Sequence, residues 1–297
     1  MLIKTLKINY YKSIKHPLIL DLPLINIFIG QNNSGKSNIL DAIEFALGGD
    51  LNNEQIYYAQ ADIEMILSFS DDEVKRHQFP DASGHFIFRD QARKLLFGTK
   101  EIPYNKSLAI ILSSKLKRLD ELSFFDLKQI ELDWQSLHKY PASLEKFKNH
   151  LKHHFPKISA SENALDINYQ HDGLYEGDRR VTIDRLGSGF LRIFAILLYI
   201  FHPSYSVVMI DEPETHLHPA MIDKLNWAMQ NAEAGQVIFT THSPLFITPV
   251  SLPQLFRVTK EANTTKVFSL SKAHYNYQRL VQELNADNLE MFFADEV

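Results

Sequence analysis

Hydrophobic and polar residues alternate along the first third of the chain. The opening MLIKTLKINY has the two-residue period of a half-buried strand, and ADIEMILSF and HFIFRD repeat that period further along. The stretch from about 111 to 160 instead has apolar residues at helical spacing, in KLKRLDELSFFDLKQIELDW and SLEKFKNHLKHHFPK. We therefore predict β-rich structure up to about residue 110, followed by a mostly helical segment.

From about residue 163 onward, short apolar strands alternate with helices. The predicted strands are ALDINYQ, YSVVMI and QVIFT, and the predicted helices begin near Phe190 and Ala220. Such alternation is typical of a sheet with helical crossovers. Because no internal repeat or low-complexity linker interrupts it, the pattern predicts one domain over residues 1–297. The predicted fold is α/β, with a mixed sheet, an antiparallel β part and a helical insertion at about 111–160.

Composition narrows the class of protein. With 297 residues, of which 45% are hydrophobic, the chain can bury a sizeable core. It has no cysteine, which excludes disulfides and thiolate metal sites and suits a reducing cytoplasm. The longest apolar run, FAILLYIF at 194–201, is too short to span a bilayer, and the lysine-bearing N-terminus does not resemble a signal peptide. We expect a soluble, cytoplasmic protein with no membrane partner.

A net charge of −5 argues against a surface that binds nucleic acid throughout. A local patch remains open in SLEKFKNHLKHHFPK, where Leu144, Phe147 and Leu151 share one helical face and the lysines and histidines lie largely elsewhere. We favour an amphipathic helix with a solvated polar face. The alternative is a contact between these cations and a nucleic-acid backbone.

A glycine-rich loop between apolar flanks, FIGQNNSGKSNIL at 28–40, carries the first candidate chemistry. It fits G-x-x-x-x-G-K-[ST], in which a strand ends and a helix begins with its free N–H groups aimed at one point. Gly30 and Gly35 can adopt positive φ and let the backbone approach a phosphate chain. Lys36 can reach the β and γ phosphates, and Ser37 offers a hydroxyl to Mg²⁺. The predicted nucleotide-binding residues are Gly30, Asn32, Asn33, Ser34, Gly35, Lys36, Ser37 and Asn38.

An acidic pair follows the apolar run in YSVVMIDEPETHLHP. Asp211 and Glu212 would lie at the end of a buried strand, where open α/β sheets bind their ligands. We predict that Asp211 holds Mg²⁺ together with Ser37. Glu212 is predicted to polarise the water that attacks the γ-phosphate.

Histidines follow two of the predicted strands. His216 and His218 form an H-x-H pair of the kind that binds zinc, but the chain offers no cysteine to complete such a set. We expect this pair to shape the turn before a helix that begins at Pro219. In VIFTTHSP the apolar strand ends in two threonines and exposes His242, which can orient water or sense the γ-phosphate.

A second glycine-rich helix start occurs in RLGSGFLRIFAILLYIF. Gly187, Ser188 and Gly189 precede an apolar helix and form a second N-terminus that can bind an anion. One nucleotide does not need two such sites from one chain. We therefore predict that the second site closes over the nucleotide of a neighbouring molecule, as in a two-fold symmetric pair.

These four segments together resemble one family. The loop at Gly30 resembles a Walker A motif, VVMIDEPETHLHP a Walker B motif with its D-loop, LGSGFLR a divergent ABC signature, and TTHSP a switch-histidine loop. Their order and the opening strand are similar to the ABC-type ATPase domains of the RecF and OLD (overcoming lysogenization defect) group, which includes Gabija-type defence nucleases. The resemblance implies a P-loop NTPase of ABC type that uses ATP and Mg²⁺ and closes as a head-to-tail homodimer.

The resemblance implies further features. SMC-type relatives interrupt the domain with very long coiled coils. Here only about 150 residues, without sustained heptads, separate Lys36 from Gly187, so the RecF and OLD branch fits better. A glutamine senses Mg²⁺ in such folds, and Gln60 in YYAQADIEM is the candidate. In OLD-like nucleases a Toprim nuclease domain follows, and NLEMFFADEV resembles its lead-in at about 290–297. DNA and a Toprim-type nuclease are thus candidate partners. No cluster of acidic residues suited to two-metal nuclease chemistry follows the lead-in, so we do not assign nuclease activity to this chain.

Two classes of function fit these motifs. In the first, an ATP-hydrolysing dimer acts as a switch for a DNA-processing or phage-defence nuclease system. In the second, ATP shapes a docking surface for DNA or an effector, and turnover is negligible. The presence of Glu212 and His242 as predicted catalytic residues favours hydrolysis.

Overall fold

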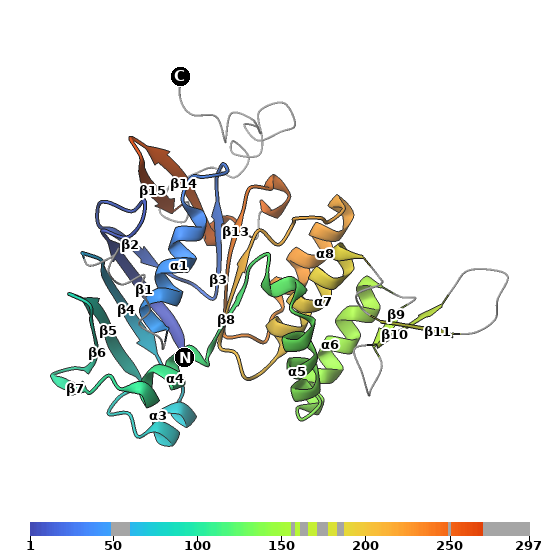
Figure 1. The fold of residues 1–297 in the computed structure, drawn as a ribbon, viewed down its shortest axis with the longest axis horizontal. Helices are drawn as coiled ribbons and strands as arrows, with labels where there is room; N and C mark the ends of the chain where they lie inside the picture. The colour runs from blue at the N-terminus through green and yellow to red at the C-terminus, as the bar shows by residue number, and fades with distance from the viewer. Residues whose placement is uncertain are drawn as a thin grey trace. The chain divides into compact units, whose positions relative to one another are not determined.

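Figure 1 shows the fold in a computed structural model, which describes residues 1–48, 60–155, 158–160, 166–170, 178–182, 187–248 and 251–269. The chain divides into two compact units. Unit 1 comprises Met1–Lys115 and Ile238–Val297, and unit 2 comprises the intervening Leu116–Val237. Segments from the two ends of the sequence therefore build unit 1 together.

An antiparallel sheet forms one layer of unit 1, in the order β2-β1-β4-β5-β6-β7 (Figure 1). Its strands are β1 (Leu2–Asn9), β2 (Leu18–Asp21), β4 (Asp62–Ser68), β5 (Ser83–Arg89), β6 (Ala92–Phe97) and β7 (Lys100–Ile102). Along β4 the buried residues are Ile63, Met65 and Leu67, as the two-residue period predicted. Helix α1 (Lys36–Leu47) packs on this buried face, where the rings of Phe45 and Phe88 lie 5.0 Å apart.

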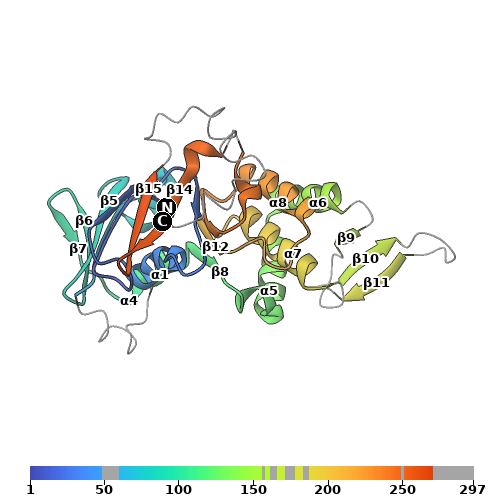
Figure 2. The ribbon, with the colours of Figure 1, turned by 90° about the horizontal axis from the view of Figure 1, so that it is seen from above.

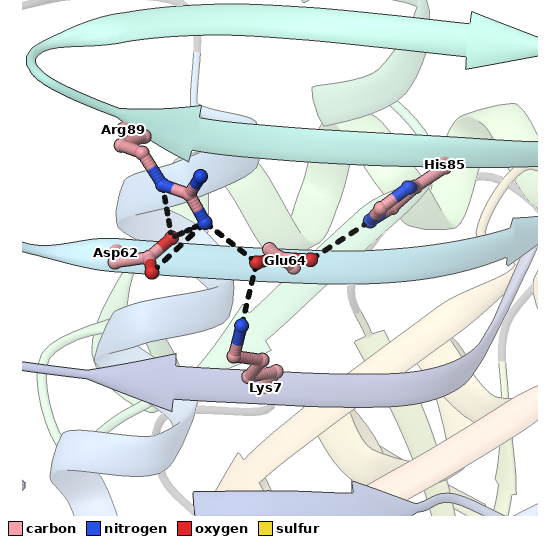
Figure 3. Close-up of polar contacts among 5 residues, drawn as sticks. All are labelled: Lys7, Asp62, Glu64, His85 and Arg89. Carbon is pink, nitrogen blue, oxygen red and sulfur yellow. Dashed lines mark hydrogen bonds and ion pairs between the residues drawn. The ribbon is translucent and has the colours of Figure 1, made fainter. Parts of the chain in front are cut away.

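Polar side chains from β1, β4 and β5 form an ion-pair network on the sheet (Figure 3). Glu64 lies at its centre and accepts hydrogen bonds from Lys7 Nζ at 2.7 Å and Arg89 Nη2 at 2.8 Å. Its other carboxylate oxygen lies 3.1 Å from His85 Nε2, and Arg89 also pairs with Asp62. Burial alone would raise the pKa of Glu64, but the hydrogen bonds and charges of Lys7 and His85 outweigh burial, so the pKa is lowered.

A second group of strands in unit 1 carries the glycine-rich loop. The strand order is β15-β14-β3-β13, and β13 begins in unit 2 and ends in unit 1. These strands are β3 (Ile25–Ile29), β13 (Gln236–Thr241), β14 (Leu255–Glu261) and β15 (Thr264–Ser269). β14 runs parallel to β3 and antiparallel to β15, and Phe28 and Phe256 are paired and stacked with their rings 5.0 Å apart. The other helical segments of unit 1 are α3 (Asp71–His77), α4 (Lys106–Ser113), η3 (Pro244–Phe246) and η4 (Leu252–Gln254).

Helices around a parallel strand pair form unit 2. Strand β8 (Leu116–Leu119) runs parallel to β12 (Val207–Asp211). The helical segments are η1 (Ser123–Phe125), α5 (Leu127–Leu137), α6 (Pro141–His154), α7 (Ser188–Phe201) and α8 (Pro219–Gln230). A small antiparallel sheet, β11-β10-β9, extends away from these helices (Figure 2). Its strands are β9 (Ile158–Ala160), β10 (Asp166–Gln170) and β11 (Asp178–Thr182).

Helix α7 is the core of unit 2. Every side chain from Phe190 to Phe201 is buried, and Phe194 lies 5.5 Å from Trp134 and 5.2 Å from Phe147, measured between ring centroids. α5 and α6 thus bury their apolar faces against α7. Within the part of the chain that the structure describes, no helix is long and apolar enough to cross a membrane.

The structure differs from the sequence prediction at one element that bears on the site. Leu116–Leu119 was expected in the helical insertion but forms β8. Leucine, lysine and arginine favour helices, so local propensity gave the wrong answer, whereas pairing with the buried strand β12 decides the conformation. The proposed Toprim lead-in at about 290–297 lies outside the described residues.

We predict that Glu64→Gln lowers the free energy of unfolding by roughly 1 kcal/mol at pH 7, because it removes the charge that Lys7 and Arg89 share. The folded-state pKa of Glu64 is depressed, so its contribution is complete above the ordinary value of 4.5 and disappears as the pH falls through the folded-state pKa. Urea unfolding at several pH values checks this. A difference between variant and parent that grows toward acid pH would contradict the ion-pair interpretation.

Candidate nucleotide site

The loop between β3 and α1 has the backbone that a phosphate-binding loop needs. Gly35 immediately precedes α1 and is left-handed, with φ 99° and ψ 18°. A Cβ atom at Gly35 would also lie 2.0 Å from Thr265 Oγ1. Both the dihedral and the space therefore require glycine here, and the predicted positive φ is confirmed at this position.

Gly30 is required for a different reason from the one expected. It does not adopt positive φ; the loop's left-handed residues are Asn33, at φ 66°, and Gly35. A Cβ atom at Gly30 would lie 2.2 Å from the carbonyl oxygen of Val258 on β14. The expectation of positive φ at Gly30 was wrong, because close approach of a neighbouring strand, rather than a turn, demands glycine there.

Lys36 begins α1 and bends back over the loop. Its side chain is buried, and Nζ donates to the carbonyl oxygens of Gly30 at 2.9 Å and Gln31 at 2.8 Å. The ammonium is thus held beside the N-terminus of a twelve-residue helix, where free N–H groups also favour an anion. Ser37, in the first turn of α1, is partly exposed. This combination of left-handed backbone, cation and helix start fits a phosphate chain.

The histidine loop adjoins the phosphate loop within unit 1. β13 ends at Thr241, whose carbonyl oxygen accepts a hydrogen bond from the Gly30 N–H at 3.3 Å. The hydroxyl of Thr241 accepts from the Ser243 N–H at 2.9 Å, which tightens the turn around the exposed His242. Long-range pairing therefore brings together two motifs that are far apart in the sequence.

Other predicted residues of unit 1 have varied surroundings. Asn32 and Asn33 are exposed, and Ser34 is buried. The Asn38 side chain donates to Ser13 Oγ at 2.5 Å, a support of the loop that sequence reasoning missed. Gln60 is exposed and lies two residues before Asp62, where β4 of the antiparallel sheet begins.

In unit 2, the acidic residue at the end of β12 pairs with an arginine that the sequence analysis did not anticipate. β12 is buried along Val207–Ile210, and Asp211 is its last residue. Arg118 Nη2 of β8 lies 3.2 Å from Asp211 Oδ2, and both side chains are mostly buried. Because the sequence analysis assigned Leu116–Leu119 to a helix, it did not place Arg118 next to Asp211. The guanidinium thus gives the predicted Mg²⁺ ligand a counter-charge from within the chain.

Glu212 is held in an unusual backbone conformation. Its φ is 46°, and its carbonyl oxygen accepts from the Thr215 N–H at 3.2 Å and from Arg192 Nη1 at 3.0 Å. Arg192 comes from α7, is 1% exposed, and places its guanidinium 4.0 Å from the centre of the Phe124 ring. A left-handed non-glycine residue costs about 1–2 kcal/mol, and these bonds offset that cost. Sequence reasoning missed Arg192, which lies inside an otherwise apolar helix.

The signature segment divides into two parts. Gly187, at φ 90°, and Ser188 are exposed at the start of α7, and a Cβ atom at Gly187 would meet nothing within 4 Å. At Gly189, by contrast, a Cβ atom would lie 2.8 Å from the carbonyl oxygen of His216. Gly189 is therefore needed for packing against the turn after β12, while Ser188 is open to the surroundings of unit 2.

The H-x-H pair lies in that same turn. His216 is left-handed, with φ 64°, and His218 caps α8 by accepting a hydrogen bond from the Ala220 N–H at its Nδ1, 3.2 Å away. Pro219 is the first residue of the helix, as predicted. The described residues include no group of three or more histidines and acids that could hold a metal ion. Both histidines thus take part in forming the turn.

Comparison with known families accounts for the order of these motifs. A family model described as "AAA domain, putative AbiEii toxin, Type IV TA system" matches residues 74–248, which is more than half of the chain. The chain belongs to this AAA domain family. A second model, "AAA ATPase domain", matches residues 1–104. Together the matches cover the phosphate loop, the signature, the acidic strand and the histidine loop of the AAA domain.

One relative comes from a bacteriophage. The AAA domain is 21% identical over 267 residues to protein ea59 of Escherichia phage lambda, and the alignment covers 82% of the chain and 50% of ea59. The chain thus spans half the length of this relative.

Solved structures similar to the AAA domain include heads of SMC proteins. An SMC head bound to the C-winged helix domain of ScpA has a TM-score of 0.67 and 16% identity, with 92% of this chain and 99% of that one covered. The SMC head domain of Thermotoga maritima has a TM-score of 0.59 and 15% identity, with 91% and 99% covered. These similarities confirm the predicted α/β fold of a P-loop NTPase of ABC type.

We predict that Lys36→Ala abolishes ATP binding, because the variant loses the cation next to the helix start. The Gly30 and Gln31 carbonyls also lose a donor, so the free energy of unfolding falls by about 1 kcal/mol. Calorimetric titration with ATP and urea unfolding measure the two effects. Lys94→Ala is the control, since Lys94 lies on β6 and pairs with Glu101. ATP affinity equal to that of the parent would refute the phosphate-loop assignment.

Proposed function

We propose that the chain is an ATP-binding and ATP-hydrolysing switch that closes as a two-fold dimer around two nucleotides. The observation that carries the proposal is the loop between β3 and α1, with Gly35 left-handed and the Lys36 ammonium held over two loop carbonyls. No feature of a generic glycine turn requires a buried lysine at the start of the following helix. A phosphate chain accounts for the left-handed backbone, the cation and the helix start together.

The residues divide into binding and catalytic roles. The loop N–H groups and Lys36 would bind the triphosphate, while Ser37 and Asp211 would hold Mg²⁺, which supplies Lewis-acid stabilisation of the phosphoryl oxygens. The Glu212 carboxylate is proposed to take the proton of the attacking water. His242, next to the phosphate loop, is proposed to orient that water. Gln60 remains the proposed metal sensor.

The Glu212 backbone supports a catalytic role for that residue. A glutamate at φ 46° stores strain, and such strain is typical of functional sites. Arg192 secures the Glu212 carbonyl from α7, which is also the helix that Ser188 begins. Helix α7 thus begins with the proposed signature serine and contacts the backbone of the proposed catalytic base through Arg192.

The dimer is proposed from the exposed start of α7. Gly187 and Ser188 are open to solvent, and their N–H groups lie at the positive end of a fourteen-residue helix. In the proposed closed state they cap the γ-phosphate bound by a second copy. Each copy would then complete the site of the other.

The biological setting is proposed from similarity alone. We place the chain in the RecF and OLD group and expect it to regulate a DNA-processing or phage-defence nuclease system, with DNA and a Toprim-type nuclease as partners. A family description that names a toxin of a type IV system and a relative from a phage are compatible with a role in conflict between phage and host.

A specific contact favours a second candidate function, a nucleotide-gated binding module with negligible turnover. The Arg118 guanidinium pairs with Asp211, so the predicted metal ligand carries a competing cation. Strong competition would slow metal-dependent chemistry while leaving nucleotide binding intact. Steady-state phosphate release, measured with and without DNA, separates the two candidates.

We predict different defects for the two acidic residues of the turn. Glu212→Gln keeps the shape but removes the base, so it should bind Mg·ATP and fail to hydrolyse it. Asp211→Asn should weaken Mg²⁺-dependent binding itself, because it removes the negative charge of a proposed metal ligand and with it the ion pair to Arg118. Nucleotide titrations with and without Mg²⁺, together with phosphate release, distinguish the variants. Identical defects in both assays would overturn this division of roles.

Dimer closure predicts that hydrolysis depends on residues from two copies. Ser188→Glu should place a negative charge against the partner's phosphate and block hydrolysis while Lys36 still binds ATP. A mixture of inactive Lys36→Ala and inactive Ser188→Glu chains should regain part of the activity, because one composite site in the heterodimer is intact. Sedimentation of Glu212→Gln with and without ATP is the companion measurement. A monomer in both conditions would overturn the dimer proposal.

A further inference from the structure

The β14–β15 hairpin contacts the phosphate loop at both of its glycines. At Gly30, the carbonyl oxygen of Val258 on β14 occupies the space of a Cβ atom, and at Gly35 the hydroxyl of Thr265 on β15 does the same. Two glycines that the motif assigns to a ligand are thus also the two positions where one hairpin meets the loop. The hairpin is held in place by β3, because Arg257 of β14 pairs with Ile29, the last residue before the loop.

Thr265 is the polar centre of this contact. Its hydroxyl lies 2.9 Å from the Ser34 carbonyl oxygen and 2.6 Å from Ser13 Oγ, and Thr265 is 4% exposed. Ser13 Oγ in turn accepts a hydrogen bond from Asn38 Nδ2 at 2.5 Å. The Thr265 N–H also donates to the Ser13 carbonyl oxygen at 2.9 Å, which fixes the two residues to each other through the backbone.

The direction of these hydrogen bonds follows from the number of protons. The carbonyl of Ser34 can only accept, so the Thr265 hydroxyl donates to it. Having used its proton, Thr265 accepts from the Ser13 hydroxyl, and Ser13 accepts from the Asn38 amide. The donors therefore run in one direction from α1, through Ser13 and Thr265, to the loop carbonyl. Aligned chains of this kind polarise and strengthen one another.

The chain of hydrogen bonds stabilises a conformation that the loop would not hold alone. Asn33 and Gly35, on either side of Ser34, are both left-handed, and the Ser34 carbonyl between them is the one that Thr265 secures. A loop already fixed in its binding conformation loses less conformational entropy when a phosphate chain binds. The support comes from Thr265, which is 231 positions away from Ser34 in the sequence.

We propose that Thr265 is a positioning residue of the phosphate loop, through which the β14–β15 hairpin sets the affinity for the triphosphate of a nucleotide. The inference rests on the proposed nucleotide-binding function of the loop. Thr265 acts through Ser34 and Ser13 rather than by touching the ligand. Its hydroxyl, and not merely its volume, is the feature that matters.

The test compares matched variants of β15. Thr265→Val keeps the shape and removes the hydroxyl, Thr265→Ser keeps the hydroxyl, and Thr264→Val makes the same change at the buried neighbour, which points to the opposite side of the strand. Calorimetry with ATP and with inorganic triphosphate measures affinity, and melting without ligand measures stability. Inorganic triphosphate tests the phosphate loop without contributions from base or sugar.

Thr265→Val should bind both ligands about tenfold more weakly than the parent, since a buried acceptor loses its donor. Thr265→Ser and Thr264→Val should bind like the parent, and Thr265→Val should melt at a lower temperature than Thr264→Val, because only Thr265→Val leaves the buried Ser34 carbonyl without its donor. If Thr265→Val folds poorly, Ser13→Ala interrupts the same hydrogen bonds and should weaken binding in the same direction. Parent-like affinity of Thr265→Val, or a serine variant as weak as valine, would overturn the proposal. A parent chain that binds neither ligand would instead overturn the nucleotide-binding function itself.

Discussion

The turn between Ile29 and Lys36 is the constraint on which the candidate chemistry of unit 1 depends. It must reverse the chain, place two residues in left-handed conformations and leave a lysine buried at a helix start. Glycine meets the left-handed requirement at position 35, but a left-handed asparagine at position 33 and a desolvated ammonium are both unfavourable alone. The turn persists because neighbours compensate: Thr241 accepts the Gly30 N–H, and Lys36 Nζ finds two carbonyls.

In unit 2, two arginines stabilise a turn that would be unfavourable alone. The turn after β12 gathers acidic residues, and a left-handed Glu212 adds strain. Arg118 forms an ion pair with Asp211, and Arg192 donates a hydrogen bond to the backbone carbonyl of Glu212. Burial lowers the pKa of Arg192, but glutamates nearby act in the opposite direction, so a cation is stable where an apolar helix alone would not admit one. The charges of the acidic turn are therefore balanced by the two arginines.

The sequence predicted those features that depend on residue type at fixed local spacing. Gly35, Lys36 and the helix start at Pro219 are read from neighbours within a few positions. What it could not supply are effects decided by distant partners. The reason for Gly30 is a carbonyl on β14, and the strand character of Leu116–Leu119 comes from pairing with β12. Thr265 is one of two adjacent threonines in a hairpin, and no local signal separates it from its neighbour.

Similarity to SMC heads at 15–16% identity, with TM-scores of 0.59–0.67, is consistent with this division. A phosphate loop constrains few side chains strongly, since most of its contacts with an anion are made by backbone N–H groups. The backbone must nevertheless be held in place, and many side-chain combinations can do so. Thr265, Ser13 and Asn38 are one such combination. A loop of this kind can therefore belong to the same fold at low sequence identity.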